Sequence, residues 1–151
     1  KIRQSREMSF VNGNCYWYGY LILDNADGVT TMLKTDIHRA KALLPAYTHM
    51  FEGKPKKVRN LKEVYTEDMH FLMWDRANDP NSPESAQKYV IYRFRQGEAV
   101  NIENAENILK ITPDNFFVLP YEGGRNQYIY VVTALDAFNN ESKVNKIKIK
   151  L

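Results

Sequence analysis

The sequence predicts a mainly β fold: a sandwich of seven strands over residues 58–151, preceded by a short α/β segment over residues 1–57. Three observations support this prediction. Downstream, short apolar stretches alternate with turn-forming stretches such as "NDPNSP" (78–83), which is the spacing of a β-sandwich. Upstream, stretches with helical spacing flank a continuous apolar run. Between the two, glycine, proline and a rise in charge interrupt both patterns in "FEGKPKKVRN" (51–60).

The N-terminal segment is predicted to contain a helix, a strand, a loop and a second helix. Residues 1–8 have the character of a helix end, and the apolar run "NCYWYGYLIL" (14–23) predicts a buried strand. A loop at 24–28 precedes residues 29–44, whose apolar side chains recur at near-helical spacing until Pro45. One strand and two helices cannot enclose a core alone. We therefore expect this segment to pack on the sandwich or on chain outside this sequence.

The C-terminal region is predicted to hold strands at roughly 58–66, 69–76, 87–95, 107–112, 115–120, 127–136 and 143–150. The stretch 127–136 is apolar on both faces, as in a strand that is central in its sheet or covered on its second face. Asn139 and Asn140 then supply the chemistry of a tight turn. In the last strand, lysines alternate with apolar residues, which predicts one solvated face.

Three of these strands resemble strands of fibronectin type III domains. The stretch "YIYVVTALDAFNNES" (128–142) resembles their penultimate strand and the turn after it. "MHFLMWD" (69–75) is similar to their second strand, and "KYVIYRF" (88–94) to their third. Order and spacing agree over about 58–151, so that the resemblance implies an immunoglobulin-like, seven-stranded sandwich.

The same resemblance assigns roles to individual side chains. Trp74 would be the core tryptophan, and Tyr89 and Ile91 would face inward. Tyr128 stands at the position of the tyrosine corner, a buried ring whose hydroxyl bonds to backbone.

The N-terminal segment is similar to the end of the barrel in a bacterial glycosyl-hydrolase-like (β/α)-barrel family. The similarity lies in "NGNCYWYGYLILDN" (12–25), the helix after it and "KALLPAY" (41–47). In that family a fibronectin type III-like domain follows the barrel. The resemblance implies a C-terminal accessory region of a larger exported protein, periplasmic, cell-surface or extracellular. Its partner would be the upstream barrel domain of the same chain.

A glycosidase needs two carboxylates, and in a (β/α) barrel they lie at the C-terminal ends of strands. Asp24 is the sole carboxylate at the end of the predicted barrel strand, and with Asn25 it is explained more simply as a loop and helix cap. We therefore assign no catalytic residue and expect this chain alone to be inactive.

Four aromatic residues, Tyr16, Trp17, Tyr18 and Tyr20, are clustered in the predicted strand. Aromatic faces bind sugar rings by stacking. Trp17 and Tyr18 are therefore the candidate substrate-binding residues, in the context of a complete barrel. The alternative is that these large side chains pack around a buried strand.

Other classes of site have weak support. The three histidines lack metal-ligand spacing, and "YEGGRNQ" (121–127) lacks the context of a nucleotide loop, so we expect no metal and no cofactor. The net charge of +3 is diffuse apart from 53–59 and 143–151, which we interpret as solvated faces and not as a nucleic-acid site. No apolar run approaches the ~20 residues of a membrane span.

Two further functions stay open. A stand-alone carbohydrate-binding sandwich would bind polysaccharide through exposed, coplanar aromatic residues, for which the candidates are Tyr92, Phe94, Phe116, Phe117 and Tyr121. A protein–protein interaction module of an adhesin or receptor would bind a partner without sugar. The fold does not choose among these functions, because sandwiches serve many.

Overall fold

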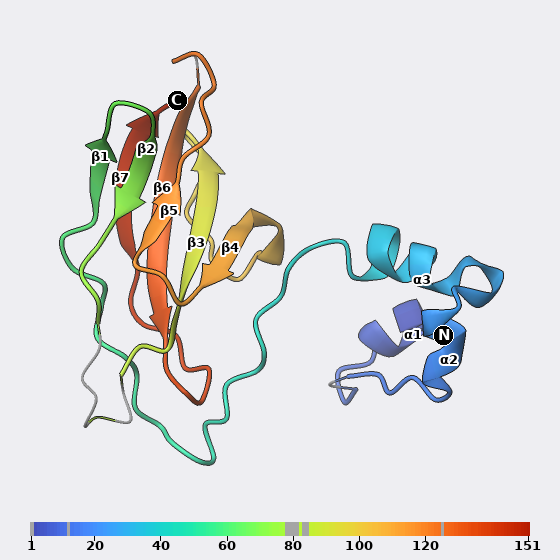
Figure 1. The fold of residues 1–151 in the computed structure, drawn as a ribbon. Coiled ribbons are helices and arrows are strands. Elements are labelled where there is room, and N and C mark those ends of the chain that lie inside the picture. The colour runs from blue at the N-terminus through green and yellow to red at the C-terminus, as the bar shows by residue number, and fades with distance from the viewer. Residues whose placement is uncertain (1, 12, 78–81, 83–84, 125) are drawn as a thin grey trace. The chain divides into compact units, whose positions relative to one another are not determined.

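The computed structural model describes residues 2–11, 13–77, 82, 85–124 and 126–151. They form two compact units, 1–40 and 41–151 (Figure 1). The predicted mainly β fold is confirmed, since the strands in the described part of the second unit form two antiparallel sheets.

Within the described residues, the first sheet has the strand order β1-β2-β5 and the second the order β4-β3-β6-β7. The strands are β1 (Lys62–Tyr65), β2 (His70–Met73), β3 (Lys88–Arg95), β4 (Ile108–Thr112), β5 (Phe116–Val118), β6 (Gln127–Leu135) and β7 (Asn145–Lys150). Each predicted strand is present, and all seven are shorter than predicted, by one to five residues. Three strands facing four, all paired antiparallel, make a fibronectin type III-like sandwich.

The core between the sheets contains the side chains that were predicted to face inward. Trp74, Tyr89 and Ile91 are 3%, 1% and 0% exposed. The rings of Trp74 and Tyr89 meet edge to face, with centroids 5.4 Å apart, a geometry that contributes about 0.5–1.5 kcal/mol beyond the burial of area. The hydroxyl of Tyr89 also accepts a hydrogen bond from the Ala77 amide at 2.8 Å.

The other face of the four-stranded sheet is covered as well. Val90, Tyr92 and Phe94 of β3 form a second buried cluster with Val131 of β6. The side chains packed on this cluster include Leu43, Val144 and those of the segment 100–105, which leads into the short 3₁₀ helix η3 (Ala105–Asn107). The prediction for 127–136 is thereby confirmed: β6 lies between β3 and β7 and is covered on both faces.

Hydrogen bonds and a ring stack join the segment 41–57 to the turn between β6 and β7. The amide of Tyr47 donates to the carbonyl of Phe138 at 2.9 Å, and the rings of Phe51 and Phe138 stack 5.5 Å apart. Asn140 Nδ2 donates to the carbonyl of Phe51 at 3.2 Å. These contacts group 41–57 with the sandwich, whereas the predicted division at residues 57 and 58 put it with the N-terminal segment. That division as a domain boundary stays a prediction.

The N-terminal unit differs from its prediction in one element. It contains α1 (Ile2–Arg6), close to the expected first helix, and α2 (Gly19–Leu23). The predicted strand at 14–23 is therefore wrong: 19–23 is helical, and the residues before it form no strand. A strand needs a ladder partner for its backbone. Local bonds, such as Asp24 N–H to the Tyr20 carbonyl at 2.8 Å, satisfy the backbone here instead.

The second predicted helix is present but shorter than 29–44. After the 3₁₀ turn η1 (Ala26–Gly28), α3 (Val29–Met32) continues into a π-helical turn, η2 (Leu33–Ile37). The amide of His38 closes that turn on the carbonyl of Leu33 at 2.7 Å, and the helix ends there.

Candidate functional site

The structure brings the two predicted sugar-binding residues together with a neighbouring tyrosine. The ring centroids of Trp17 and Tyr18 lie 5.7 Å apart at 66°, and those of Tyr18 and Tyr20 5.6 Å apart at 58°. Trp17 is 79% exposed and Tyr18 59%. The expected packing around a buried strand is therefore not seen for these side chains in this chain. Their steep ring angles give exposed aromatic surface, but no flat platform for a sugar ring.

Asp24 lies at the end of a helix, which agrees with its interpretation as part of a loop and helix cap. It is the C-terminal cap residue of α2, and Asn25 next to it orders the turn that follows. The side chain of Asn25 accepts from the Thr31 amide at 3.1 Å and donates to the Thr31 hydroxyl at 3.1 Å. Asp24 itself takes part through its backbone, whose amide donates to the carbonyl of Tyr20 at 2.8 Å.

The aromatic residues proposed for a stand-alone carbohydrate site are mostly buried. Tyr92 and Phe94 are 0% and 2% exposed, and Phe117 packs against the core between the sheets. Phe116 and Tyr121 are the two exposed members of the set. The hypothesis of a coplanar aromatic platform thus loses three of its five side chains.

Tyr92 serves a different purpose. Its hydroxyl donates to Glu141 Oε1 at 2.7 Å, and the hydroxyl of Thr133 donates to the same oxygen at 2.5 Å. Burial first, and the hydrogen bond to Glu141 second, raise the pKa of Tyr92 well above its usual range. The contact ties the turn before β7 to the outer face of the four-stranded sheet.

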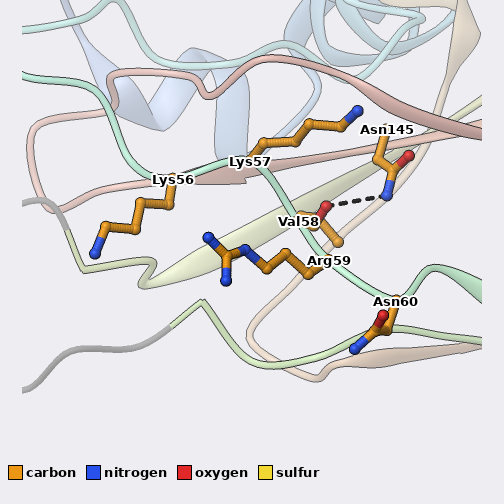
Figure 2. Close-up of a pocket in the computed structure, with 6 residues that line it drawn as sticks. All are labelled: Lys56, Lys57, Val58, Arg59, Asn60 and Asn145. Atoms are coloured by element: carbon orange, nitrogen blue, oxygen red, sulfur yellow. Dashed lines mark hydrogen bonds between the residues drawn. The ribbon is translucent and has the colours of Figure 1, made fainter.

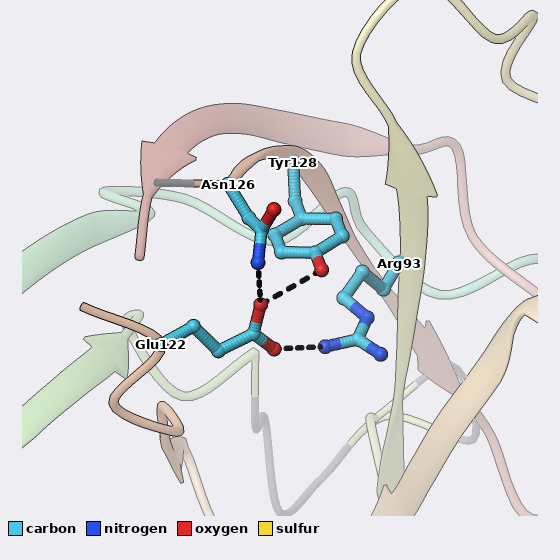
Figure 3. A network of polar contacts seen from close by, with 4 residues as sticks. All are labelled: Arg93, Glu122, Asn126 and Tyr128. Carbon is cyan, nitrogen blue, oxygen red and sulfur yellow. Dashed lines mark hydrogen bonds and ion pairs between the residues drawn. The ribbon is translucent and has the colours of Figure 1, made fainter. Parts of the chain in front are cut away.

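Glu122 is the centre of a polar network at one end of the sandwich (Figure 3). Its carboxylate accepts from the hydroxyl of Tyr128 at 2.8 Å, from Asn126 Nδ2 at 2.7 Å and from Arg93 Nη1 at 3.1 Å. The guanidinium of Arg93 also lies 4.5 Å from the centroid of the Tyr128 ring. These groups, the Tyr128 hydroxyl foremost, lower the pKa of Glu122, and the same hydrogen bond raises the pKa of Tyr128.

This network corrects the tyrosine-corner prediction. The hydroxyl of Tyr128 does join the loop before β6, but its partner is the carboxylate of Glu122 and not a backbone group. These four side chains bond to one another and hold the loop before β6 against the sheet. The network is therefore a structural contact and not a reactive site.

A second cluster, which the sequence interpretation missed, joins β1 and β2. The rings of Tyr65 and His70, which are cross-strand partners, stack 4.1 Å apart at 12°. Glu63 Oε1 accepts from the hydroxyl of Tyr65 at 2.7 Å and lies 2.6 Å from His70 Nε2. The hydrogen bond to Glu63 raises the pKa of Tyr65. Such cross-strand pairs stabilise a hairpin, and that role explains the cluster.

A basic groove of about 560 Å³ lies beside the start of β7 (Figure 2). Its described lining residues are Lys56, Lys57, Val58, Arg59, Asn60 and Asn145. The sequence interpretation had treated these lysines as a solvated face only.

Two kinds of site are absent from the described residues. No three His, Cys, Asp or Glu side chains among them gather closely enough to hold a metal ion. In the same ranges, every helix is too short or too polar to cross a lipid bilayer.

The larger unit is thus a fibronectin type III-like β-sandwich. No family model matches the chain. The sequence is weakly similar to a Bacillus subtilis protein, glycosyl hydrolase YngK, with 24% identity over 147 residues. That match covers 97% of this chain but only 28% of the relative, so the chain spans less than a third of that protein's length.

Two solved structures are similar at the level of fold. The spore cortex lytic enzyme SleM of Clostridium perfringens matches 64% of this chain and 28% of its own, with a TM-score of 0.44 and 12% identity. A structure described as FN3tt mut matches 65% of this chain and 97% of its own, with a TM-score of 0.48 and 12% identity.

Proposed function

We propose that this chain is the C-terminal, non-catalytic region of a larger exported glycoside hydrolase-like protein. In that protein the sandwich is an accessory module that packs on an upstream (β/α)-barrel domain or spaces it from a surface. The observation that carries the proposal is the sequence similarity to a glycosyl hydrolase. The match covers nearly the whole of this chain but less than a third of that relative.

The surface of the N-terminal unit supports the same proposal. Phe10, Trp17 and Leu23 are 80%, 79% and 85% exposed, and Leu33 and Ile37 are the buried apolar side chains of its described part. Covering a large apolar side chain stabilises a protein by about 1.5–3 kcal/mol. Large exposed apolar side chains mark an interface where they gather into one patch. We assign its cover to the upstream barrel of the same protein, and we place Trp17 and Tyr18 at the edge of that barrel's substrate cleft.

The carboxylates described above suit an accessory role. Asp24 belongs to a helix end, and Glu63 and Glu122 are each held by a tyrosine hydroxyl. A glycosidase would need two carboxyl groups facing a common substrate. We therefore place the catalytic pair in the upstream domain, and we place the protein in the periplasm, at the cell surface or outside the cell.

The test is the intact mass of the native protein, recovered from its source with an antibody to residues 58–151. We expect a mass several times the 17.7 kDa of this chain, in an envelope or secreted fraction. A native chain near 17.7 kDa would overturn the proposal.

The non-catalytic part of the proposal has a separate test. The purified chain should release no reducing ends from a panel of neutral and acidic polysaccharides. Hydrolysis that copurifies with this chain, and that Trp17→Ala abolishes, would contradict it.

A further inference from the structure

The groove beside β7 is formed where two basic stretches of the sequence meet. Residues 53–62 contain Lys54, Lys56, Lys57, Arg59 and Lys62, and residues 142–151 contain Lys143, Lys146, Lys148 and Lys150. Neither stretch has an acidic residue. Asn145 Nδ2 donates to the carbonyl of Val58 at 3.0 Å, so this hydrogen bond brings the two stretches side by side.

The positive charge is concentrated in these two stretches. They hold nine of the 21 basic residues and none of the 18 acidic ones, which leaves 12 basic against 18 acidic residues in the rest of the chain. These two stretches are therefore the basic part of an otherwise acidic chain. Such a region attracts anions and orients them as they approach.

The cationic side chains that line the groove are available to a ligand. Lys56, Lys57 and Arg59 are exposed, and in the described part of the structure none of them forms an ion pair. Figure 2 shows the three side chains fanning out from their segment, with Asn145 beside Val58. None of the described residues that line the groove is acidic.

The backbone beneath these side chains is fixed. Val58 is 1% exposed and belongs to the core between the sheets, and the carbonyl of Arg59 accepts from the Asp75 amide at 3.0 Å. Asn60, in the left-handed conformation at φ 50°, donates its Nδ2 to Asp75 Oδ2 at 2.6 Å. The backbone that carries these cations is thus held in place before a ligand binds. Less backbone entropy is therefore lost on binding.

We propose that this groove binds an anionic polysaccharide, one that carries carboxylates at regular intervals along its chain. The guanidinium of Arg59 can bind a carboxylate through two parallel hydrogen bonds, and the lysines act as point charges. A single exposed ion pair contributes little in salt. Repeated anions on one polymer engage several cations at once and gain affinity through effective concentration.

The groove is less suited to nucleic acid. Single-stranded nucleic acid binds on aromatic side chains that stack with bases, and none of the described groove residues is aromatic. The choice of a glycan rests on the proposed function, since a hydrolase of polysaccharides has a use for a second glycan contact.

The first experiment measures the affinity of the chain for polygalacturonate by titration calorimetry. The test variant carries Lys56→Gln, Lys57→Gln and Arg59→Gln. The control variant carries Lys88→Gln, Arg95→Gln and Lys110→Gln, which removes the same charge from exposed positions on β3 and β4. We expect about a tenfold loss of affinity in the test variant and less than about twofold in the control. Thermal unfolding of both variants checks that they are folded.

Two other polymers separate the glycan from other anions. Poly-L-glutamate at equal charge should bind about tenfold more weakly than polygalacturonate, because it has no sugar hydroxyls to accept hydrogen bonds from the groove lysines and Arg59. A DNA duplex should bind more weakly as well. The proposal is overturned if polygalacturonate does not bind, if both variants lose equal affinity, or if poly-L-glutamate or DNA binds as tightly as the glycan.

This test and the test of the proposed function can fail separately. In one outcome, the groove binds polygalacturonate while the native mass is near 17.7 kDa. That pair of results would support the binding site and overturn the accessory role. A much larger native protein without affinity for polygalacturonate would keep the accessory role and overturn the site.

Discussion

Two apolar runs of similar length have opposite structures in this chain. Residues 127–135 form β6, a strand with a neighbour on each side and a covered surface on each face. Residues 14–23 are just as rich in aromatic and aliphatic residues, yet 19–23 is a helical turn with no buried residue. The two sequences are similarly apolar, and what differs is the strand pairing available to each. In this chain β6 is hydrogen-bonded to β3 on one side and to β7 on the other.

The comparison teaches that an apolar run predicts burial only together with the surface that buries it. In the sandwich, the ladder partners of β6 come from residues up to 47 positions away in sequence, as in the pair of Lys88 and Leu135. In the described part of the N-terminal unit, short-range hydrogen bonds satisfy the backbone while Trp17 and Leu23 stay exposed. Stability should therefore be distributed very unequally between the two units.

The largest expected effect comes from matched truncations of one aliphatic side chain in each unit. Ile91→Ala opens a cavity at a residue that is 0% exposed, and it should lower the free energy of unfolding by about 3–4 kcal/mol. Leu23→Ala changes a residue that is 85% exposed, and it should cost less than about 0.5 kcal/mol. Urea unfolding followed by circular dichroism measures both. Equal losses would break the comparison.

The unfolding free energies of two N-terminal deletions show where the stabilising contribution to the sandwich begins. Deleting residues 1–57 removes Leu43 and Phe51, which pack on the sandwich, and should cost about 2–3 kcal/mol and lower solubility. Deleting residues 1–40 retains both side chains, so its unfolding free energy should stay within about 1 kcal/mol of the full chain. If the two deletions have the same melting temperature, segment 41–57 contributes nothing to the sandwich.

A smaller effect is expected from the buried hydroxyl of Tyr92. Tyr92→Phe removes the hydrogen bond to Glu141 and should cost about 1–1.5 kcal/mol. Tyr121→Phe, at a residue that is 94% exposed, is the matched control and should cost less than about 0.5 kcal/mol. A loss in the control as large as that of Tyr92→Phe would show that the contact with Glu141 contributes little.

The Glu122 network predicts a pH dependence. Because the folded-state pKa of Glu122 is lowered, its contribution to stability is present above the pKa of the unfolded chain and is lost as the pH falls through the folded value. The unfolding midpoint in urea should therefore fall below about pH 4.5, and less so in Glu122→Gln than in the unchanged chain. Glu67→Gln, at an exposed residue, is the control. Identical acid profiles for Glu122→Gln and the unchanged chain would contradict the network.

Much of the sandwich could be predicted from the sequence because its signals are local. Short apolar stretches and polar turns mark the strands, and the inward positions of Trp74, Tyr89 and Ile91 follow from the resemblance to fibronectin type III strands. The strand ends could not be predicted as well. Val58, for example, is buried in the core, but lies outside the ladder of β1.

The functional surfaces were harder to predict because they join distant residues. Nothing in the spacing of Glu122 and Arg93 shows that they meet, since their contact depends on the path of the loop before β6. The basic groove depends likewise on the crossing of residues 56–60 beside Asn145. Trp17 and Tyr18 were placed in one cluster by their proximity in sequence, and their role as sugar-binding residues stays a prediction.

Amide hydrogen exchange on the intact chain tests whether burial differs between the two runs, because it measures protection along both at once. We expect the amides of β6 to exchange only through global unfolding, and those of 14–23 to exchange many times faster. Equal protection of 14–23 and β6 would contradict this expectation, because the N-terminal unit would then have a buried, self-sufficient core of its own.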